Sequence, residues 1–345
     1  MRIFSRFTVC WLALLALSAC DNTAPPGAAG EVNLYSSRHY DTDLALYDDF
    51  TRDTGIQVNR IEAGADELIA RIQSEGESSP ADLLITVDAG RLWRAEQAGI
   101  FQAVDSAVLK ERVPANMRHP EGLWTGLSKR ARVIIYNREA GLPTPLADYT
   151  DLADPTHAGK VCIRSSSNIY NVSLMASMVA HLGEAAAESW AEGVVRNFAR
   201  TPQSNDTGQI RAVASGECQI AVVNTYYLAR LAASDEPADL AVAAAVGIVF
   251  PDQQGNWTHV NISGAGVVST SPNRDNAVRF LEYLTSDRAQ SLFADGNNEY
   301  PAVPSVGASS KVVALGEFKE DGLNAAELGV HQSTAIMVFD RAGWQ

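Results

Sequence analysis

The 345-residue chain has few of the residues and motifs that build the commonest catalytic and metal sites. It contains four cysteines and six histidines, with no C-x-x-C pair and no zinc-type spacing. The motifs G-x-S-x-G and H-E-x-x-H and a glycine-rich phosphate loop are also absent. These absences argue against the hydrolases, zinc proteases and nucleotide-binding enzymes that depend on such motifs. We therefore expect a protein that is not an enzyme.

Positive charge is scarce as well. The chain has 27 Lys and Arg against 41 Asp and Glu, which gives a formal net charge of −14. A strongly acidic surface disfavours nucleic acid and anionic lipid as partners. It suits a protein that captures a cation or docks on a basic partner.

Long apolar runs are missing except near the start of the chain. A basic region with Arg2 and Arg6 precedes an apolar run at residues 7–17, which is too short to span a bilayer and is typical of a secretory signal. The following Leu-Ser-Ala-Cys is similar to a bacterial lipobox, in which Cys20 carries lipid and becomes the new N-terminus. Asp21 resembles the signal that retains a lipoprotein at the inner membrane. We expect a periplasmic lipoprotein, attached to the membrane only through its lipid.

Two regions follow from this interpretation: a signal peptide at residues 1–19, and a lipidated cysteine with a flexible Ala-, Pro- and Gly-rich tether at residues 20–30. Beyond the tether the chain keeps only Cys162 and Cys218. In an oxidising compartment these two are expected to form a disulfide rather than to bind a metal.

The rest of the chain alternates apolar strands with amphipathic helices, which predicts an α/β fold with a parallel sheet covered on both faces. In the first set we expect strands at 32–36, 56–61 and 80–86, with helices at 41–54, 65–75 and 89–98. In a second set we expect strands at 131–136, 161–163, 220–223 and 266–268, with helices at 170–182 and 274–285.

About 315 residues are more than one core usually serves, so we expect two lobes joined by crossing strands. We assign residues 31–132 and 257–307 to an N-terminal lobe, and residues 133–256 and 308–345 to a C-terminal lobe. Open α/β sheets bind ligands beyond the carboxyl ends of their strands, which places the site in the cleft between the lobes.

The most informative feature is the pair Tyr226 and Tyr227, where the strand at 220–223 gives way to a helix. A phenolate oxygen is a hard anionic donor of the kind that a hard trivalent ion such as Fe³⁺ prefers. Two further strand-to-helix turns carry Tyr170 and the pair His39 and Tyr40. Helix N-termini favour anions, so we expect these five residues to form one metal site.

Four phenolates and a neutral imidazole around Fe³⁺ would carry a net charge of −1, so cations should lie nearby. Arg38 is next to His39, Arg230 lies one helical step beyond Tyr227, and Arg130 lies at the expected crossing between the lobes. We expect these arginines to support the ligands without binding the metal.

Several motifs together resemble the ferric-iron-binding proteins of bacterial ABC importers, above all the tyrosine-rich branch known from cyanobacteria. They lie at residues 17–20, 32–40, 67–69, 79–82, 88–92, 98–101 and 224–227. The resemblance implies a two-lobed periplasmic-binding fold of type II, with transferrin-like lobes that close on Fe³⁺ and hand it to a permease. It implies that His39 and Tyr40 come from the first lobe and the other three tyrosines from the second. Many relatives place a glutamate ligand where this chain has Val87, which makes Tyr40 the replacement.

Two alternatives remain from the sequence. The same fold could bind an oxyanion such as phosphonate or sulfate, because helix N-termini and the serines at 165–167 suit anions, or it could bind a polyamine. A secreted metal-dependent enzyme is more remote, since five protein donors would leave no open metal position. An anion such as carbonate could also join the iron. We expect the protein to act as a monomer.

Overall fold

The computed structural model describes residues 30–38, 40–203, 205–256 and 258–345. The predicted signal peptide, Cys20 and almost all of the tether lie outside the described residues, and so does His39. Within the described ranges, none of the helices combines the length and the apolar character needed to span a bilayer.

A single mixed sheet runs through the molecule in the order β2-β1-β3-β8-β4-β6-β5, and β7 and β9 also pair with β4. The pairs β1–β2, β1–β3 and β5–β6 are parallel and the others antiparallel. The strands are β1 (Glu31–Ser36), β2 (Gln57–Glu62), β3 (Leu83–Val87), β4 (Thr125–Asn137), β5 (Val161–Cys162), β6 (Ile220–Asn224), β7 (Val246–Val249), β8 (Val260–Val267) and β9 (Tyr300–Pro301).

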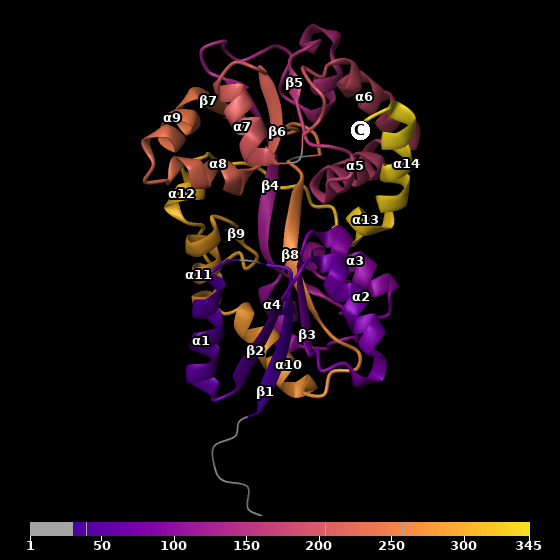
Figure 1. Cartoon of the computed structure of the whole chain (residues 1–345), viewed down its shortest axis with the longest axis vertical. Helices are drawn as coiled ribbons and strands as arrows, with labels where there is room; N and C mark the ends of the chain where they lie inside the picture. Colours follow the sequence, from indigo (N-terminus) through magenta and orange to yellow (C-terminus); the bar gives the residue numbers. More distant parts are fainter. Residues whose placement is uncertain (1–29, 39, 204, 257) are drawn as a thin grey trace, which may run out of the picture.

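The helices cover both faces of the sheet, as the alternating pattern predicts (Figure 1). They are α1 (Asp43–Thr54), α2 (Ala65–Glu75), α3 (Ala89–Gln97), α4 (Ala107–Arg112), α5 (Ile169–Leu182), α6 (Glu184–Arg196), α7 (Asp206–Ala214), α8 (Thr225–Ala232), α9 (Pro237–Ala245), α10 (Arg274–Leu284), α11 (Asp287–Asn297), α12 (Ser310–Val313), α13 (Ala325–Val330) and α14 (Gln332–Ala342).

Two long strands join the halves of the molecule (Figure 1). The first part of β4 pairs with β8, from Thr125 to Ala131, and the second part pairs with β6, from Arg132 to Tyr136. We call the half around β1–β3 the first lobe and the half around β5–β7 the second lobe. The predicted two-lobed α/β architecture with crossing strands is confirmed.

Each lobe has its own apolar core on both sides of the sheet. In the first lobe, for example, Phe50 of α1 packs against Phe280 of α10, with ring centroids 4.8 Å apart. In the second lobe, Phe339 of α14 packs against Trp344 at 4.8 Å. The C-terminal segment contacts both cores, because α13 packs with the first lobe and α14 with the second. The division of the chain into lobe segments stays a prediction.

The predicted disulfide between Cys162 and Cys218 is present, with a Cα–Cα distance of 5.8 Å. Cys162 ends β5 and Cys218 lies two residues before β6. The bond therefore connects the two strands that lead into Tyr170 and into the Tyr226–Tyr227 pair.

Replacing Cys162 with serine should lower the stability of the protein without removing a ligand of the tyrosine site. The two cysteines are 56 residues apart, and closing a loop of that size in the unfolded chain is worth about 4 kcal/mol in the chain-entropy model. Urea unfolding measures the loss, with reduced wild-type protein as the matched control. An unchanged unfolding midpoint would contradict a stabilising role for the bond.

Candidate functional site

Four of the five predicted ligands line one cavity between the lobes. Tyr40 comes from the first lobe, and Tyr170, Tyr226 and Tyr227 come from the second. The cavity has a volume of about 330 Å³. Its other lining residues are Ser37, Arg38, Gly64, Ala65, Val87, Arg91 and Arg230.

The two adjacent tyrosines both reach this cavity because they stand in the first turn of a helix. Strand β6 ends at Asn224 and α8 begins at Thr225, so Tyr226 and Tyr227 follow at once. Their ring centroids are 4.3 Å apart with an angle of 30° between the planes. Such adjacent residues diverge inside a helix, whereas here the phenols lie side by side.

Tyr170 is placed by a helix cap. The side chain of Asn168 accepts a hydrogen bond from the backbone N–H of Tyr170 at 3.1 Å, which fixes the first turn of α5. The hydroxyl of Tyr226 then donates to the hydroxyl of Tyr170 at 3.3 Å. Two strand-to-helix turns that are 56 residues apart in the chain thus bring their phenol oxygens into contact.

All three predicted supporting arginines lie close to tyrosine rings. The guanidinium carbon of Arg230 is 6.0, 5.8 and 6.0 Å from the ring centroids of Tyr40, Tyr226 and Tyr227. Arg38 lies 4.8 Å from the ring of Tyr40. At these distances a cation attracts the face of an aromatic ring and also stabilises a phenolate if one forms.

Tyr170 has two arginines beside it, of which the sequence pointed to only one. The guanidinium carbon of Arg130 is 5.9 Å from the ring centroid of Tyr170, and that of Arg164 is 5.2 Å from it. Arg164 lies two residues after β5, so its place just beyond the end of a strand was the available signal.

The pKa values of three phenols, those of Tyr40, Tyr170 and Tyr226, are raised, which favours their neutral form. Burial, with Glu299 nearby, raises the pKa of Tyr40 to about 12. Burial also raises the pKa of Tyr170 and, further, that of Tyr226. A metal ion that binds these oxygens must therefore displace their protons. It binds only if its affinity for the phenolates exceeds the free-energy cost of removing those protons.

A buried ionic network lies beneath Tyr40. Arg38 donates to Asp43 at 2.8 Å and to Glu299 at 3.1 Å, and all three side chains are almost fully buried. Burial by itself would lower the pKa of Arg38, but the two carboxylates outweigh it and the pKa is raised. Glu299 is a residue that sequence reasoning missed, since it lies 261 residues from its partner.

Arg130 contributes to the same network through one nitrogen and keeps two others available. Its Nη1 donates to the hydroxyl of Ser263 at 3.1 Å, and Ser263 also accepts from Arg38 at 2.8 Å. Among the described residues, the buried Nε and Nη2 of Arg130 have no hydrogen-bond partner. Burial by itself would lower the pKa of Arg130, but nearby acidic groups, Glu299 first among them, outweigh it and the pKa is raised.

The comparison with known proteins now identifies the family. Residues 78–319 match the bacterial extracellular solute-binding protein family. The chain belongs to this family. It is 52% identical to iron uptake protein A1 of Synechocystis sp. over 95% of this chain and 93% of that protein.

Solved structures agree with the assignment. A Trichodesmium protein solved in complex with iron and citrate, named IdiA or FutA, is 56% identical, with a TM-score of 0.89 over 92% of this chain and all of that chain. The ferric binding protein from Campylobacter jejuni is 37% identical, with a TM-score of 0.85 over 91% of this chain and all of that chain. The resemblance seen in the sequence is confirmed at the level of family and fold.

No group of three His, Cys, Asp or Glu side chains that could hold a metal ion occurs in the described part of the chain. Val87 lines the tyrosine cavity, where many ferric-binding relatives place a glutamate. Among the described residues, the phenols are therefore the groups in this cavity that can become anionic donors when a cation displaces their protons.

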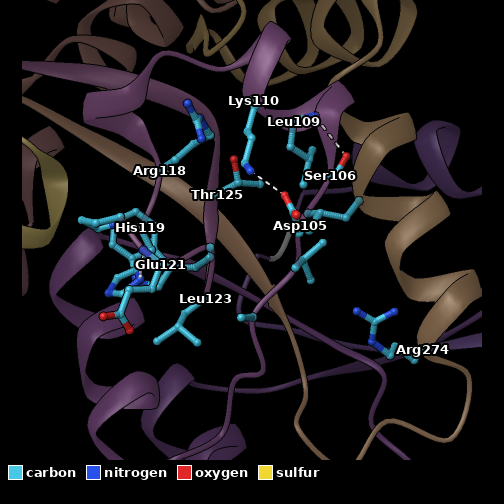
Figure 2. Close-up of a pocket in the computed structure, with 16 residues that line it drawn as sticks. Asp105, Ser106, Leu109, Lys110, Arg118, His119, Glu121, Leu123, Thr125 and Arg274 are labelled. Atoms are coloured by element: carbon cyan, nitrogen blue, oxygen red, sulfur yellow. Dashed lines mark hydrogen bonds and ion pairs between the residues drawn. The ribbon is translucent and has the colours of Figure 1, made fainter.

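A second cavity, of about 290 Å³, lies in the first lobe between α4 and α10, away from the tyrosines (Figure 2). Lys110 forms an ion pair with Asp105 at its edge, and Leu109 and Trp124 supply apolar walls. None of the predicted ligand or supporting residues lines it. The chemistry of the cavity between the lobes, and not its size, makes that cavity the candidate site.

Proposed function

We propose that this solute-binding protein captures Fe³⁺ between its two lobes and delivers it to an ABC permease for iron uptake. One observation carries the proposal: four tyrosines from both lobes line a single cavity, and arginines lie against their rings. The relatives named as iron uptake and ferric-iron-binding proteins, at up to 53% identity among the curated matches, support the same cargo.

The proposed ligands are the phenolate oxygens of Tyr40, Tyr170, Tyr226 and Tyr227, with His39 as a fifth donor. Hard anionic oxygens select hard trivalent cations over softer divalent ones. The raised pKa values favour the same choice, because a weakly polarising ion would not displace the phenolic protons. The bound iron is cargo and leaves with each delivery.

Charge balance assigns the arginines a supporting role. Arg38, Arg130 and Arg230 each lie within about 6 Å of a proposed ligand ring and would offset the negative charge of four phenolates. An additional anion such as carbonate could complete the iron shell. The two Arg130 nitrogens for which the described part of the chain supplies no hydrogen-bond partner are suited to hold it.

Capture then follows from the arrangement of the lobes. The second lobe supplies three phenols, so iron would bind there first, and Tyr40 would complete the shell when the lobes close about β4 and β8. Protonation of the phenolates, reduction to Fe²⁺, or opening of the lobes at the permease would release the ion.

The lipobox at Cys20 also suggests where in the cell the protein acts. An acyl chain on Cys20 would hold the protein at the inner membrane, and residues 20–30 would let the folded domain move to its permease. The carrier would act as a monomer, since one chain supplies every proposed ligand.

A visible absorption titration tests the proposal. Purified mature protein, titrated with ferric citrate, should develop an intense tyrosinate-to-iron charge-transfer band that saturates at one iron per chain. A protein that stays colourless would contradict the ferric site and favour the oxyanion-binding alternative. Protein preincubated with excess zinc and then titrated with ferric citrate is the matched control. Zn²⁺ has no such transition, so an iron titration that zinc leaves unchanged shows that the tyrosines select against a divalent ion.

A further inference from the structure

Asp88 is a buried carboxylate that touches both lobes. It lies one residue beyond Val87, between β3 and α3, and its side chain is fully buried. Its backbone φ is 89°, a value that favours glycine and that an aspartate adopts only when its surroundings hold it there. The contacts of the Asp88 side chain therefore compensate for the strain in its backbone.

Those contacts come from three different elements. One oxygen of Asp88 accepts hydrogen bonds from the backbone N–H of Gly90 at 2.9 Å and from the hydroxyl of Ser173 at 2.6 Å. The other oxygen accepts from the side-chain amide of Asn261 at 2.9 Å. Gly90 is the second residue of α3 and Asn261 lies on the crossing strand β8, whereas Ser173 belongs to α5 of the second lobe.

The partner on α5 is one turn away from a proposed iron ligand. Ser173 lies three residues after Tyr170, on the same face of the helix. The fit between the lobes is close at this point: a Cβ on Gly90 would come within 3.3 Å of Ile169, the first residue of α5. The β3–α3 turn thus holds the start of α5 by a hydrogen bond and by direct packing.

The cap of α3 accounts for only part of this arrangement. The bond from Gly90 to Asp88 is an ordinary helix cap and would form without the second lobe. The Ser173 bond adds nothing to that cap, and both of its partners are completely buried. It links the helix that carries Tyr170 to the crossing strand through Asn261.

We propose that Asp88 is a positioning residue for cargo binding, which fixes the first turn of α5 so that Tyr170 meets Tyr40 across the cleft. Asp88 does not line the tyrosine cavity and acts through Ser173. Its role rests on the proposed function, because Tyr170 is taken as an iron ligand. Asp88 follows Val87, the position at which the family resemblance implies a glutamate ligand. In this proposal Asp88 supports the ligand Tyr170 and does not bind the iron itself.

The test compares iron release from Ser173→Ala, which removes the donor of this bond, and from Asp88→Asn, which removes the charge of its acceptor. Iron-loaded protein is mixed with excess EDTA, and the loss of the charge-transfer band gives the release rate. Ser173→Ala and Asp88→Asn should each release iron about tenfold faster, the effect expected for a buried hydrogen bond to a charged group. The maximum of the band should also shift, because the Tyr170 oxygen is no longer held in place.

The chain supplies a matched control on the same helix. Ser177 lies one turn after Ser173, is also buried, and donates at 3.4 Å to Asp321 instead of Asp88. Ser177→Ala should change thermal stability by an amount similar to Ser173→Ala but leave the release rate unchanged. Unchanged release in Ser173→Ala, or equal acceleration in Ser177→Ala, would overturn the proposal. If Asp88→Asn does not fold, Ser173→Ala decides alone.

Hydrogen exchange gives a second measurement that does not depend on iron. In the apo protein, amides at the start of α5 should exchange faster in Ser173→Ala than in wild type, and not in Ser177→Ala. If wild-type protein shows no iron band, the proposed function fails, and the exchange rates then decide whether Asp88 anchors α5. No difference in exchange would overturn the anchoring role.

Discussion

Tyr227→Phe is expected to weaken ferric-iron binding by at least about a hundredfold. Substitutions of groups that only support metal ligands already cost about 10–100-fold, and this change removes a proposed ligand oxygen itself. The ring of Tyr227 would still stack on Tyr226 at a centroid distance of 4.3 Å, so the packing of α8 is kept. Competition against citrate, followed at the charge-transfer band, measures the affinity.

Tyr283→Phe is the matched control for this experiment. The buried hydroxyl of Tyr283 in the first lobe has no hydrogen-bond partner among the described residues, and its ring packs on Phe50 at 5.3 Å. Removing that oxygen should leave iron affinity at the wild-type value and should not destabilise the protein. Wild-type affinity in Tyr227→Phe would remove Tyr227 from the ligand set.

The sequence predicted the tyrosine cavity because each tyrosine follows a strand and begins, or just precedes, a helix. That signal is local, and in an α/β sheet the carboxyl ends of strands gather at the cleft. Tyr40, Tyr170, Tyr226 and Tyr227 therefore meet as expected. His39 shares this local signal and stays a prediction, since it lies outside the described residues.

The supporting groups were harder to predict because their partners are distant in the chain. Glu299 pairs with Arg38 across 261 residues, and Asp88 pairs with Ser173 across 85. Asp88 begins one of the motifs that carry the family resemblance, but that motif does not indicate its partner, and Glu299 lies in no such motif. The first pair depends on a tertiary contact within the first lobe and the second on a contact between the lobes, and a single sequence displays neither.

The fold shows the same division between local and distant signals. The helix predicted at 65–75 coincides with α2, whose apolar stripe is strong. The strand predicted at 131–136 is longer in the structure, because β4 begins at Thr125. Residues 125–130 include glycine, serine and two basic residues, and they become a strand through pairing with β8. Propensity was overridden there by tertiary context.

Arg132→Met is expected to destabilise the protein by about 3–5 kcal/mol, because it leaves a buried carboxylate without its main charge partner. Arg132 is 1% exposed and donates to Asp206 at 3.2 Å, and Asp206 is 0% exposed. Asp206 also accepts from the backbone N–H of Asn224 at 2.8 Å, so its charge has a fixed place beside the start of α8. Urea unfolding of the apo variant measures the loss.

Arg211→Met is the control, since Arg211 pairs with Asp239 at 2.9 Å on the surface of the same lobe and should cost less than about 1 kcal/mol. Equal losses in the two variants would contradict the role assigned to burial. Arg132 also donates to Asn171 at 2.6 Å, next to Tyr170, and to Asn224 at 3.1 Å. One guanidinium thus stabilises both turns that present phenols to the cleft, and the stability of the second lobe and the geometry of its half of the site depend on the same contacts.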